Sequence, residues 1–174
     1  MTVLVTGAAG FIGYHLSEAL LARGESVLGI DDLNAYYDPA LKQGRLAQLA
    51  GRPGFRFIKL SVADRESVAA LMADHPEIDR IIHLAAQAGV RFSMIDPYAY
   101  VTANLMGHVV MLEAARHRRG LRHFVYASSS SVYGGNTKLP FSIDDGVEKP
   151  NSLYAATKRA DELFGHTYAH LYGI

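Results

Sequence analysis

The chain has no cysteine among its 174 residues, and its formal net charge is zero. The absence of cysteine excludes a disulfide framework and a thiolate metal site, although it does not identify the cellular compartment. The 17 basic and 17 acidic side chains cancel, so charge gives no reason to expect a nucleic acid or an anionic membrane as a partner.

Long apolar runs are also missing. The apolar stretch at the N-terminus has no basic flank and is interrupted by Gly7, so it resembles neither a signal peptide nor a membrane span. No repeat, low-complexity segment or interdomain linker divides the chain, and 174 residues are enough for one domain with its own core. We therefore expect a single soluble domain and a cytoplasmic location.

The first 23 residues predict a strand, a glycine turn and a helix. The buried strand is the β-branched run Val3–Val5, and apolar residues at helical spacing follow the turn. Gly7 permits a tight turn, Gly10 lets a pyrophosphate approach the backbone, and Gly13 lets the helix pack close to the strand. The spacing is Gly-x-x-Gly-x-x-Gly instead of Gly-x-Gly-x-x-Gly, so an ordinary strand-to-helix turn remains the alternative.

An acidic pair ends the second predicted strand, Ser26–Ile30. Asp31 stands roughly 20 residues beyond the glycines, where a carboxylate can accept both hydroxyls of the adenosine ribose. A 2′-phosphate would meet the negative charge of Asp31 and Asp32, so the pair favours NAD over NADP. A simple turn cap at this position remains open.

Strands and helices alternate through the whole chain. Further strands are predicted at 55–60, 80–84 and 123–127, and helices at 11–23, 39–50, 65–74, 98–118 and 152–171. The alternation predicts an α/β fold of the Rossmann type, a doubly wound parallel sheet with helices on both faces. Ligands of such sheets bind beyond the carboxyl ends of the strands, where the polar residues singled out here are found.

Tyr154 and Lys158 lie four residues apart at the start of the last predicted helix, so their side chains share one face. A free phenol, with a pKa of about 10, is a poor base at neutral pH. A neighbouring ammonium stabilises the phenolate, so the pair can act as a general base toward a sugar or alcohol hydroxyl. Such pairs are common on helices, and it is the glycine turn, the strand-end acid and the nearby serines that favour catalysis.

Four motifs carry a family resemblance. They are Thr6-Gly-Ala-Ala-Gly-Phe-Ile-Gly13, His83-Leu-Ala-Ala86, Ser128-Ser-Ser-Ser-Val-Tyr-Gly134 and Tyr154-Ala-Ala-Thr-Lys158. Together they resemble the extended short-chain dehydrogenase/reductases, and among these the NAD-dependent nucleotide-sugar epimerases and dehydratases. Three stretches are most similar to UDP-glucuronate 4-epimerases, namely Leu33-Asn-Ala-Tyr-Tyr-Asp38, Ala86-Gln-Ala-Gly-Val-Arg91 and Ala169-His-Leu-Tyr-Gly173.

The resemblance implies which residues hold NAD. Those placed against the pyrophosphate, the adenosine ribose and the rest of the cofactor are Gly7, Gly10, Phe11, Ile12, Gly13, Asp31, Asn34, Leu84, Ala85, Ala86, Asn104, Tyr154 and Lys158. The sequence departs from the family at Ser61, where an Asp near the adenine is usual. The departure weakens that contact without removing the case for NAD.

The resemblance also implies a catalytic set of Ser129, Tyr154 and Lys158, with Tyr154 as the base. Gln87, Arg91 and Ser129 would border the nucleotide-sugar pocket. Family members that eliminate water usually carry Asp-Glu after the catalytic serine or threonine, and the glucuronate decarboxylases carry Glu. This chain has two further serines there, which favours epimerisation at C4 because that reaction needs no extra carboxylate.

The implied enzyme is an isomerase that inverts C4 of UDP-glucuronate through a 4-keto sugar, with NAD as cofactor. A UDP-glucose 4-epimerase, another sugar-nucleotide epimerase or dehydratase, and a non-catalytic NAD-binding module remain open. We expect residues 1–174 to be the NAD-binding portion, without the C-terminal lobe that binds the sugar, and to be inactive alone. A homodimer through the helices at 98–118 and 152–171 is expected. No metal site is expected, because His166 and His170 lack a third ligand.

Overall fold

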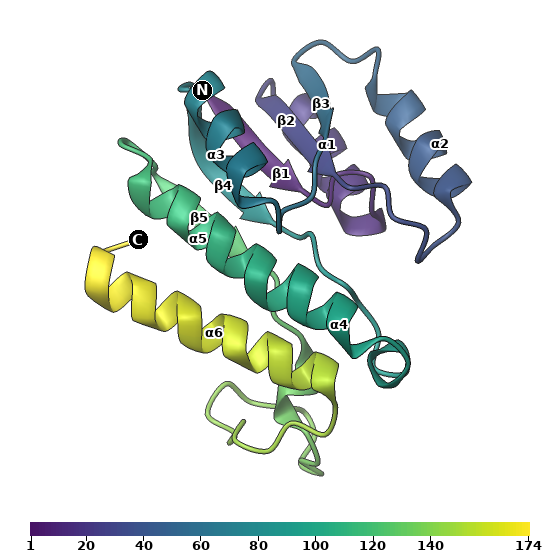
Figure 1. The fold of residues 1–174 in the computed structure, drawn as a ribbon, viewed down its shortest axis with the longest axis vertical. Helices are drawn as coiled ribbons and strands as arrows, with labels where there is room; N and C mark the ends of the chain where they lie inside the picture. The colour runs from purple at the N-terminus through teal and green to yellow at the C-terminus, as the bar shows by residue number, and fades with distance from the viewer.

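A computed structural model describes all residues from 1 to 174. It contains a five-stranded parallel sheet flanked by helices, as the alternation of elements predicts (Figure 1). None of the helices combines the length and the apolar character that crossing a membrane requires.

Strand β1 (Thr2–Thr6) is the middle of the sheet and is buried along its whole length. It pairs with β2 (Ser26–Asp31) on one side and with β4 (Ile78–His83) on the other. The edges are β3 (Phe55–Lys59) and β5 (His123–Tyr126), so the order is β3-β2-β1-β4-β5. The strand order reverses between β1 and β4, and such a switch point is where open α/β sheets bind ligands.

Helices follow the strands, and several of them begin at a residue whose side chain caps the first turn. They are α1 (Phe11–Ala22), α2 (Pro39–Leu49), α3 (Arg65–Asp74), α4 (Pro97–Tyr100), α5 (Gly107–His117) and α6 (Leu153–Tyr172), with short 3₁₀ helices η1 (Phe92–Met94) and η3 (Ser130–Tyr133). The side chains of Asp38, Asp64 and Ser152 accept an amide hydrogen bond from the first turn of α2, α3 and α6. These three caps satisfy amides that a helix cannot pair internally.

One predicted element was wrong. The stretch 98–118 is not a single α-helix, because α4 passes into a π-helical turn, η2 (Val101–Met106), before α5 begins. Its apolar spacing fits one helix, but the π turn changes which side chains face the sheet. The strand predicted at 80–84 also begins earlier, at Ile78. The remaining helices and strands were confirmed, with boundaries that agree to within one residue.

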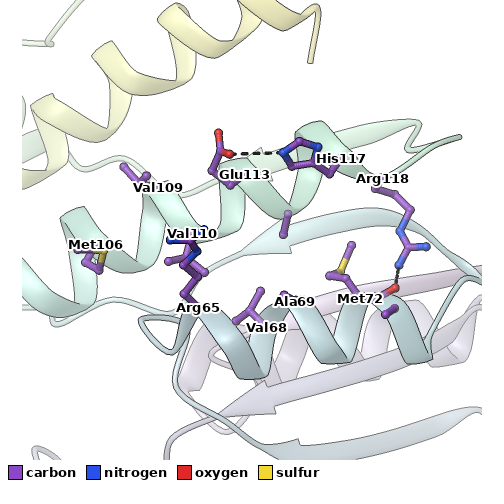
Figure 2. A pocket seen from close by; sticks show the side chains of 12 residues that line it. Arg65, Val68, Ala69, Met72, Met106, Val109, Val110, Glu113, His117 and Arg118 are labelled. Atoms are coloured by element: carbon purple, nitrogen blue, oxygen red, sulfur yellow. Dashed lines mark hydrogen bonds and ion pairs between the residues drawn. The ribbon is translucent and has the colours of Figure 1, made fainter.

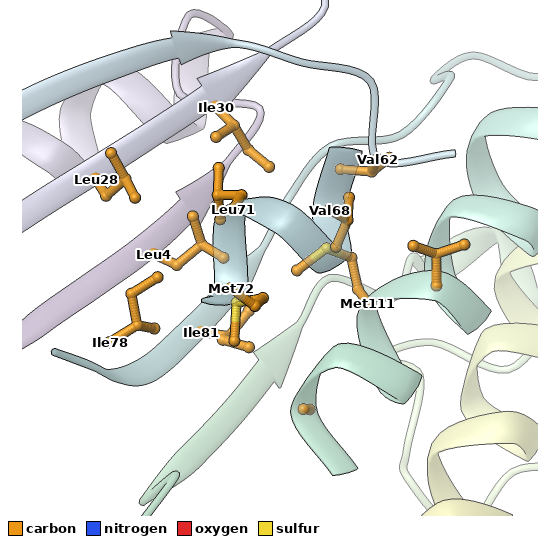
Figure 3. Packing of buried hydrophobic residues seen from close by; sticks show 12 residues of the cluster. Leu4, Leu28, Ile30, Val62, Val68, Leu71, Met72, Ile78, Ile81 and Met111 are labelled. Atoms are coloured by element: carbon orange, nitrogen blue, oxygen red, sulfur yellow. The ribbon is translucent and has the colours of Figure 1, made fainter. Parts of the chain in front are cut away.

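The core lies on both faces of the sheet, because successive residues of a strand point in opposite directions. Leu4 packs in the larger cluster, together with Val68 of α3 and Met111 of α5 (Figure 3). Val3 and Val5 point to the other face, where they pack against α1. A continuous apolar run therefore suits β1, which is covered on both sides.

Candidate functional site

The carboxyl ends of β1, β2 and β4 border a hollow of about 120 Å³. Many of the residues predicted to hold the cofactor line it, namely Gly7, Gly10, Asp31, Asn34, Leu84, Ala85 and Ala86. The lining also includes Gln87, which was predicted to border the sugar, and Ser61, where the sequence departs from the family. Tyr36, Tyr37 and Lys42 complete this part of the lining. The structure thus brings together, at one rim of the sheet, residues from segments that are far apart in the chain.

The glycine turn leaves no room for side chains. A Cβ on Gly13 would lie 2.2 Å from the carbonyl oxygen of Gly7, and a Cβ on Gly7 would lie 2.9 Å from the amide nitrogen of Ala85. Gly7 also has a φ of +70°, in the left-handed region that favours glycine. The helix that follows therefore starts directly against the backbone of the turn.

The N-terminus of α1 is uncapped. No side-chain oxygen accepts a hydrogen bond there, and the amides of Phe11 and Ile12 have no acceptor within the chain. Both side chains are exposed. Free amides and the positive end of the helix dipole together suit an anionic group such as a phosphate.

Thr6 fastens the end of β1 to the segment after β4. Its Oγ1 accepts hydrogen bonds from the amides of Leu84 (3.0 Å) and Ala85 (2.9 Å) and lies 2.8 Å from Nδ1 of His83. A hydroxyl has two lone pairs and one hydrogen, so that hydrogen points to Nδ1. His83 is therefore neutral with its proton on Nε2. Burial, with the nearby His108 and Lys158, lowers its pKa well below the usual value, in agreement.

We expect Thr6→Val to destabilise the fold by about 2–4 kcal/mol, because each buried donor or acceptor left without a partner costs about 1–3 kcal/mol. The substitution keeps the shape of the side chain and removes only the hydroxyl. Urea unfolding measures the effect. Thr2→Val is the matched control, since Thr2 is also buried on β1 but holds no amide at the rim. Equal effects of the two substitutions would contradict the role given to the Thr6 hydroxyl.

Asp31 is buried, and its carboxylate has three hydrogen-bond partners within the chain. Its Oδ2 accepts the amide of Ala9 (3.2 Å), and its Oδ1 accepts the amide of Leu33 (2.8 Å) and lies 3.0 Å from Nζ of Lys42. Lys42 is itself buried, with 8 % of its side chain exposed. Asn34 lies beside this group and donates to the Asp32 carboxylate. Asp31 is therefore paired with the buried ammonium of Lys42. The sequence analysis missed this partner.

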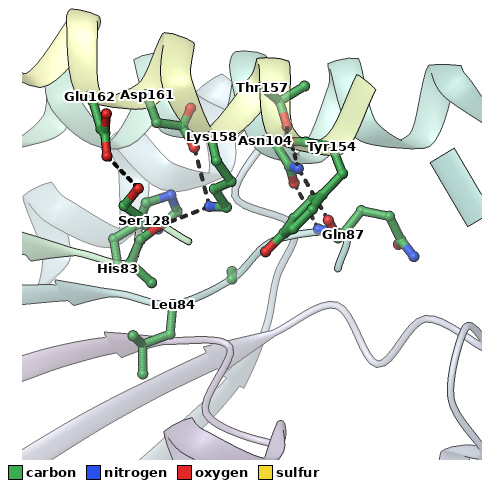
Figure 4. Close-up of polar contacts among 12 residues, drawn as sticks. His83, Leu84, Gln87, Asn104, Ser128, Tyr154, Thr157, Lys158, Asp161 and Glu162 are labelled. Atoms are coloured by element: carbon green, nitrogen blue, oxygen red, sulfur yellow. Dashed lines mark hydrogen bonds and ion pairs between the residues drawn. The ribbon is translucent and has the colours of Figure 1, made fainter. Parts of the chain in front are cut away.

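Tyr154 and Lys158 extend from the first turns of α6 toward the strand ends (Figure 4). Nζ of Lys158 donates to the carbonyl of Ala127, just beyond β5 (3.0 Å), and to Oδ2 of Asp161 (3.2 Å). The ring of Tyr154 is half-buried and stands edge-on to Tyr100, with centroids 6.1 Å apart. The predicted pair thus shares one face, and the ammonium is tied to the end of the sheet.

The π turn η2 places Asn104 against the strand-end segment. Its Oδ1 accepts the amide of Gln87 (2.7 Å), and its Nδ2 donates to the Gln87 carbonyl (3.1 Å) and to Oγ1 of Thr157 (2.9 Å). Asn104 thereby joins α6 to the rim. Its direct contact with a cofactor stays a prediction, as both amide hydrogens are already used. The Gln87 side chain is buried, and its Nε2 has no partner.

The two other predicted residues lie at the edge of the site. Ser129 immediately precedes η3, and its Oγ accepts the amide of Ser131 (3.2 Å). Arg91 is exposed at the start of η1 and forms no ion pair. Their roles toward a substrate stay predictions. The preceding serine, Ser128, instead donates to the carboxylate of Glu162 (Figure 4).

His108 on α5 adds a second buried imidazole behind the site. Its ring stacks on that of His83, with centroids 5.4 Å apart, and meets the ring of Tyr126 edge-on. Nε2 of His108 has no hydrogen-bond partner. Burial, assisted by the charge of Lys158, lowers the pKa of His108 to about 4.

We expect His108→Phe to raise stability at acid pH. His108 stays neutral in the fold down to about pH 4, whereas in the unfolded chain it binds a proton below its ordinary value of 6.5. Its stability contribution is therefore present above pH 6.5 and is lost as the pH falls toward 4. The midpoints of urea unfolding at about pH 7 and about pH 5, compared between the unsubstituted protein and His108→Phe, measure this loss. His166→Phe, at an exposed position, should leave the pH dependence unchanged. If the pH dependence survives His108→Phe, another group such as His83 carries it.

A larger groove of about 700 Å³ lies between α3 and α5 (Figure 2). Its lining is mostly apolar, and it includes Val68, Met72 and Val110. The groove is formed by helix surfaces and contains none of the predicted site residues. The hollow at the strand ends is therefore the better candidate for the functional site.

Residues 3–174 match the model of the NAD dependent epimerase/dehydratase family. The chain belongs to this family. It is 49% identical over 173 residues to UDP-glucuronate 4-epimerase 3 of Arabidopsis thaliana, covering 99% of this chain and 40% of that protein. The resemblance to the nucleotide-sugar epimerases and the Rossmann-type fold predicted from the sequence are thereby confirmed.

Solved structures of epimerases are similar over the whole chain. The UDP-glucuronic acid 4-epimerase of Bacillus cereus, in complex with UDP-glucuronic acid and NAD, has a TM-score of 0.89 at 38% identity, covering 100% of this chain and 54% of that one. The UDP-glucose 4-epimerase of Thermotoga maritima, with UDP-glucose, has a TM-score of 0.86 at 30% identity, with coverage of 100% and 53%. The chain thus spans about half the length of the relatives it matches.

Proposed function

We propose that the chain is the NAD-binding portion of a UDP-glucuronate 4-epimerase. The observation that supports this most directly is the Tyr154–Lys158 pair, which lies in the first turns of α6, with Lys158 tied to the carbonyl of Ala127 just beyond β5. A protein that only binds NAD has no need of such a base. The choice of UDP-glucuronate follows the relatives named above, two of which are UDP-glucuronate 4-epimerases.

The residues present fit NAD. The turn at Gly7 and Gly13 is too tight for a Cβ, and it leads to free amides at the start of α1, where the pyrophosphate would lie. Asp31 would accept from the adenosine ribose, with Lys42 balancing its charge. When bound, NAD supplies a reversible acceptor for the hydride of the sugar C4.

The chain's own residues would move the proton. The Tyr154 oxygen takes the proton of the sugar 4-hydroxyl as a 4-keto sugar forms. It returns the proton after the sugar has rotated to present its other face. The Lys158 ammonium stabilises the phenolate and can donate a third hydrogen to a ribose hydroxyl. Ser129 would share the hydrogen bond to the sugar oxygen, while Gln87 and Arg91 border the sugar.

We further infer a homodimer formed through α5 and α6. Apolar side chains are exposed on α6 at Leu163 (50 %) and Leu171 (59 %), and next to α5 at Met106 (55 %). Burying such a stripe against a second copy is favourable because apolar surface leaves water. A cytoplasmic location remains a prediction.

Turnover tests the proposal. We expect the full-length protein to convert UDP-glucuronate into its C4 epimer and the 174-residue chain to bind NAD⁺ without turnover. Calorimetric titration measures the binding, with Gly10→Val as the variant in which it is lost. Turnover of UDP-glucose alone would favour a UDP-glucose 4-epimerase. Saturable NAD⁺ binding without turnover of any UDP-sugar by the full-length protein would favour a non-catalytic module.

A further inference from the structure

Asp161 is a buried carboxyl that the proposed mechanism does not use. It lies one helical turn after Lys158, and its side chain is 2 % exposed. Its Oδ2 lies 3.2 Å from Nζ of Lys158, and its Oδ1 has no hydrogen-bond partner. A carboxylate removed from water normally has all of its lone pairs engaged, so this one is held chiefly by a single ammonium.

Titratable groups approach Asp161 from three elements. Lys158 and Glu162 share α6 with it, and the other groups are His108 on α5 and Tyr126 on β5. His83 on β4 lies behind His108 and stacks on its ring. Both histidines are kept neutral by burial, and burial raises the pKa of Tyr126, so that phenol is also neutral. Lys158 is therefore the one cation in contact with the Asp161 carboxyl.

Glu162, the other acid, is turned elsewhere. Its carboxylate accepts from Ser128 and lies 2.9 Å from the Arg159 guanidinium. Figure 4 shows the two neighbouring acids with different partners, Asp161 facing Lys158 and Glu162 facing Ser128. The chain thus offers an internal comparison: the Asp161 carboxylate contacts the Lys158 ammonium directly, and the Glu162 carboxylate does not.

We propose that Asp161 is a positioning residue for the Tyr154–Lys158 pair, and that its charge limits how strongly the Lys158 ammonium stabilises the Tyr154 phenolate. The carboxyl and the Ala127 carbonyl hold Nζ from two sides. A carboxylate at this distance compensates much of the positive charge, whereas a neutral carboxyl leaves the full charge acting on the phenol. The catalytic part of this inference rests on the proposed function, but the charge coupling does not.

Protonation of the carboxyl can occur within the range in which such an enzyme works. Burial raises the pKa of Asp161 to about 6, against the opposing influence of Lys158. Below that pH the neutral carboxyl strengthens the influence of Lys158 on the phenol. Above it the ionised carboxylate holds the ammonium more firmly but weakens that influence. The two effects of Asp161, on position and on charge, can therefore be separated by substitution.

Asp161→Asn separates them, because the amide oxygen still accepts from Lys158 while the negative charge is gone. We expect the Tyr154 phenolate to form at lower pH in this variant, by roughly half a unit to one unit. Ultraviolet difference absorbance of the full-length protein follows the phenolate, with the spectrum of Tyr154→Phe subtracted. If Asp161 had only a structural role, its replacement would loosen Lys158 and shift the titration of Tyr154 to higher pH.

Glu162→Gln is the matched control, as it removes an equal charge from the adjacent position. Its shift should be clearly smaller than that of Asp161→Asn, because Glu162 faces Ser128 and Arg159. Equal shifts, no shift, or a shift to higher pH in Asp161→Asn would each overturn the proposal. None of these titrations requires enzymatic turnover. If the epimerase assignment alone is wrong, the Tyr154 titrations will still shift as expected, but the full-length protein will not convert UDP-glucuronate.

A measurement on the unsubstituted protein covers the case in which Asp161→Asn does not fold. The ammonium NMR signal of Lys158, assigned by its loss in Lys158→Arg, is followed across about pH 6. We expect the signal to shift with an inflection near that pH as the facing carboxyl gains its proton. A signal that stays constant through this range would overturn the proposal.

Discussion

Replacing Tyr154 by Phe in the full-length protein is expected to lower kcat by about 10²–10⁴-fold, the usual contribution of a general acid–base. The substitution removes only the phenolic oxygen, and the ring can keep its edge-on contact with Tyr100. NAD⁺ binding should persist, because the glycine turn and Asp31 lie on other elements. Steady-state kinetics with UDP-glucuronate measure the first effect, and calorimetry measures the second.

Tyr168→Phe is the control for this loss. Tyr168 lies on the same helix, and its hydroxyl donates to Glu113 (2.7 Å), away from the strand ends. Burial, with the hydrogen bond to Glu113, raises the pKa of Tyr168 to about 12, so this phenol stays neutral at neutral pH. Its removal should leave kcat unchanged. If Tyr154→Phe kept most of its activity, the base would have to be another residue.

Gly13→Ala is expected to weaken NAD⁺ binding by at least about tenfold and to destabilise the chain by about 1–3 kcal/mol. The added Cβ would lie 2.2 Å from the carbonyl oxygen of Gly7 and 2.8 Å from its carbonyl carbon. Both atoms belong to the backbone, so the turn must move away from α1. That movement displaces the free amides at Phe11 and Ile12, which we expect to face the pyrophosphate.

Gly44→Ala is the matched control for this substitution. Gly44 lies on α2, where a new Cβ meets nothing within 4 Å. Alanine is favoured over glycine in a helix by about 1 kcal/mol, so Tm should rise and NAD⁺ affinity should not change. Thermal unfolding and calorimetry on the same preparations compare the two variants. Unchanged NAD⁺ affinity in Gly13→Ala would mean that the pyrophosphate lies elsewhere.

Local patterns accounted for most of the fold and for part of the site. Apolar β-branched runs predict β1 and β2 because both strands are covered on two faces. The glycine turn and Asp31 are recognisable because the functions predicted for them require particular residue types at fixed distances along one strand–turn–helix unit. Helical spacing predicts that Tyr154 and Lys158 share a face, and the glycine turn, the strand-end acid and the nearby serines single the pair out. In each of these cases the contacts lie within about one supersecondary unit.

Features that depend on tertiary contacts were not predictable in the same way. The π turn η2 interrupts a regular apolar spacing, and it places Asn104 on the backbone of Gln87, which lies 17 residues earlier. Lys42 occupies a helical position typical of a solvated face, yet it is buried against Asp31, 11 residues earlier. Asp161 could have been noticed, because it shares a face with Lys158, but its burial depends on α5 and β5.

The hydrogen bonds of Thr6 have a consequence for synthesis on the ribosome. The hydroxyl at the end of β1 bonds to the amide of Leu84, 78 residues later in the chain. Until the segment after β4 has been translated, the turn beside Gly7 lacks the backbone that closes it. Such long-range closure is slow compared with helix formation. We therefore expect nascent chains that end before β4 to remain unable to capture the dinucleotide, although their glycine turn is already complete.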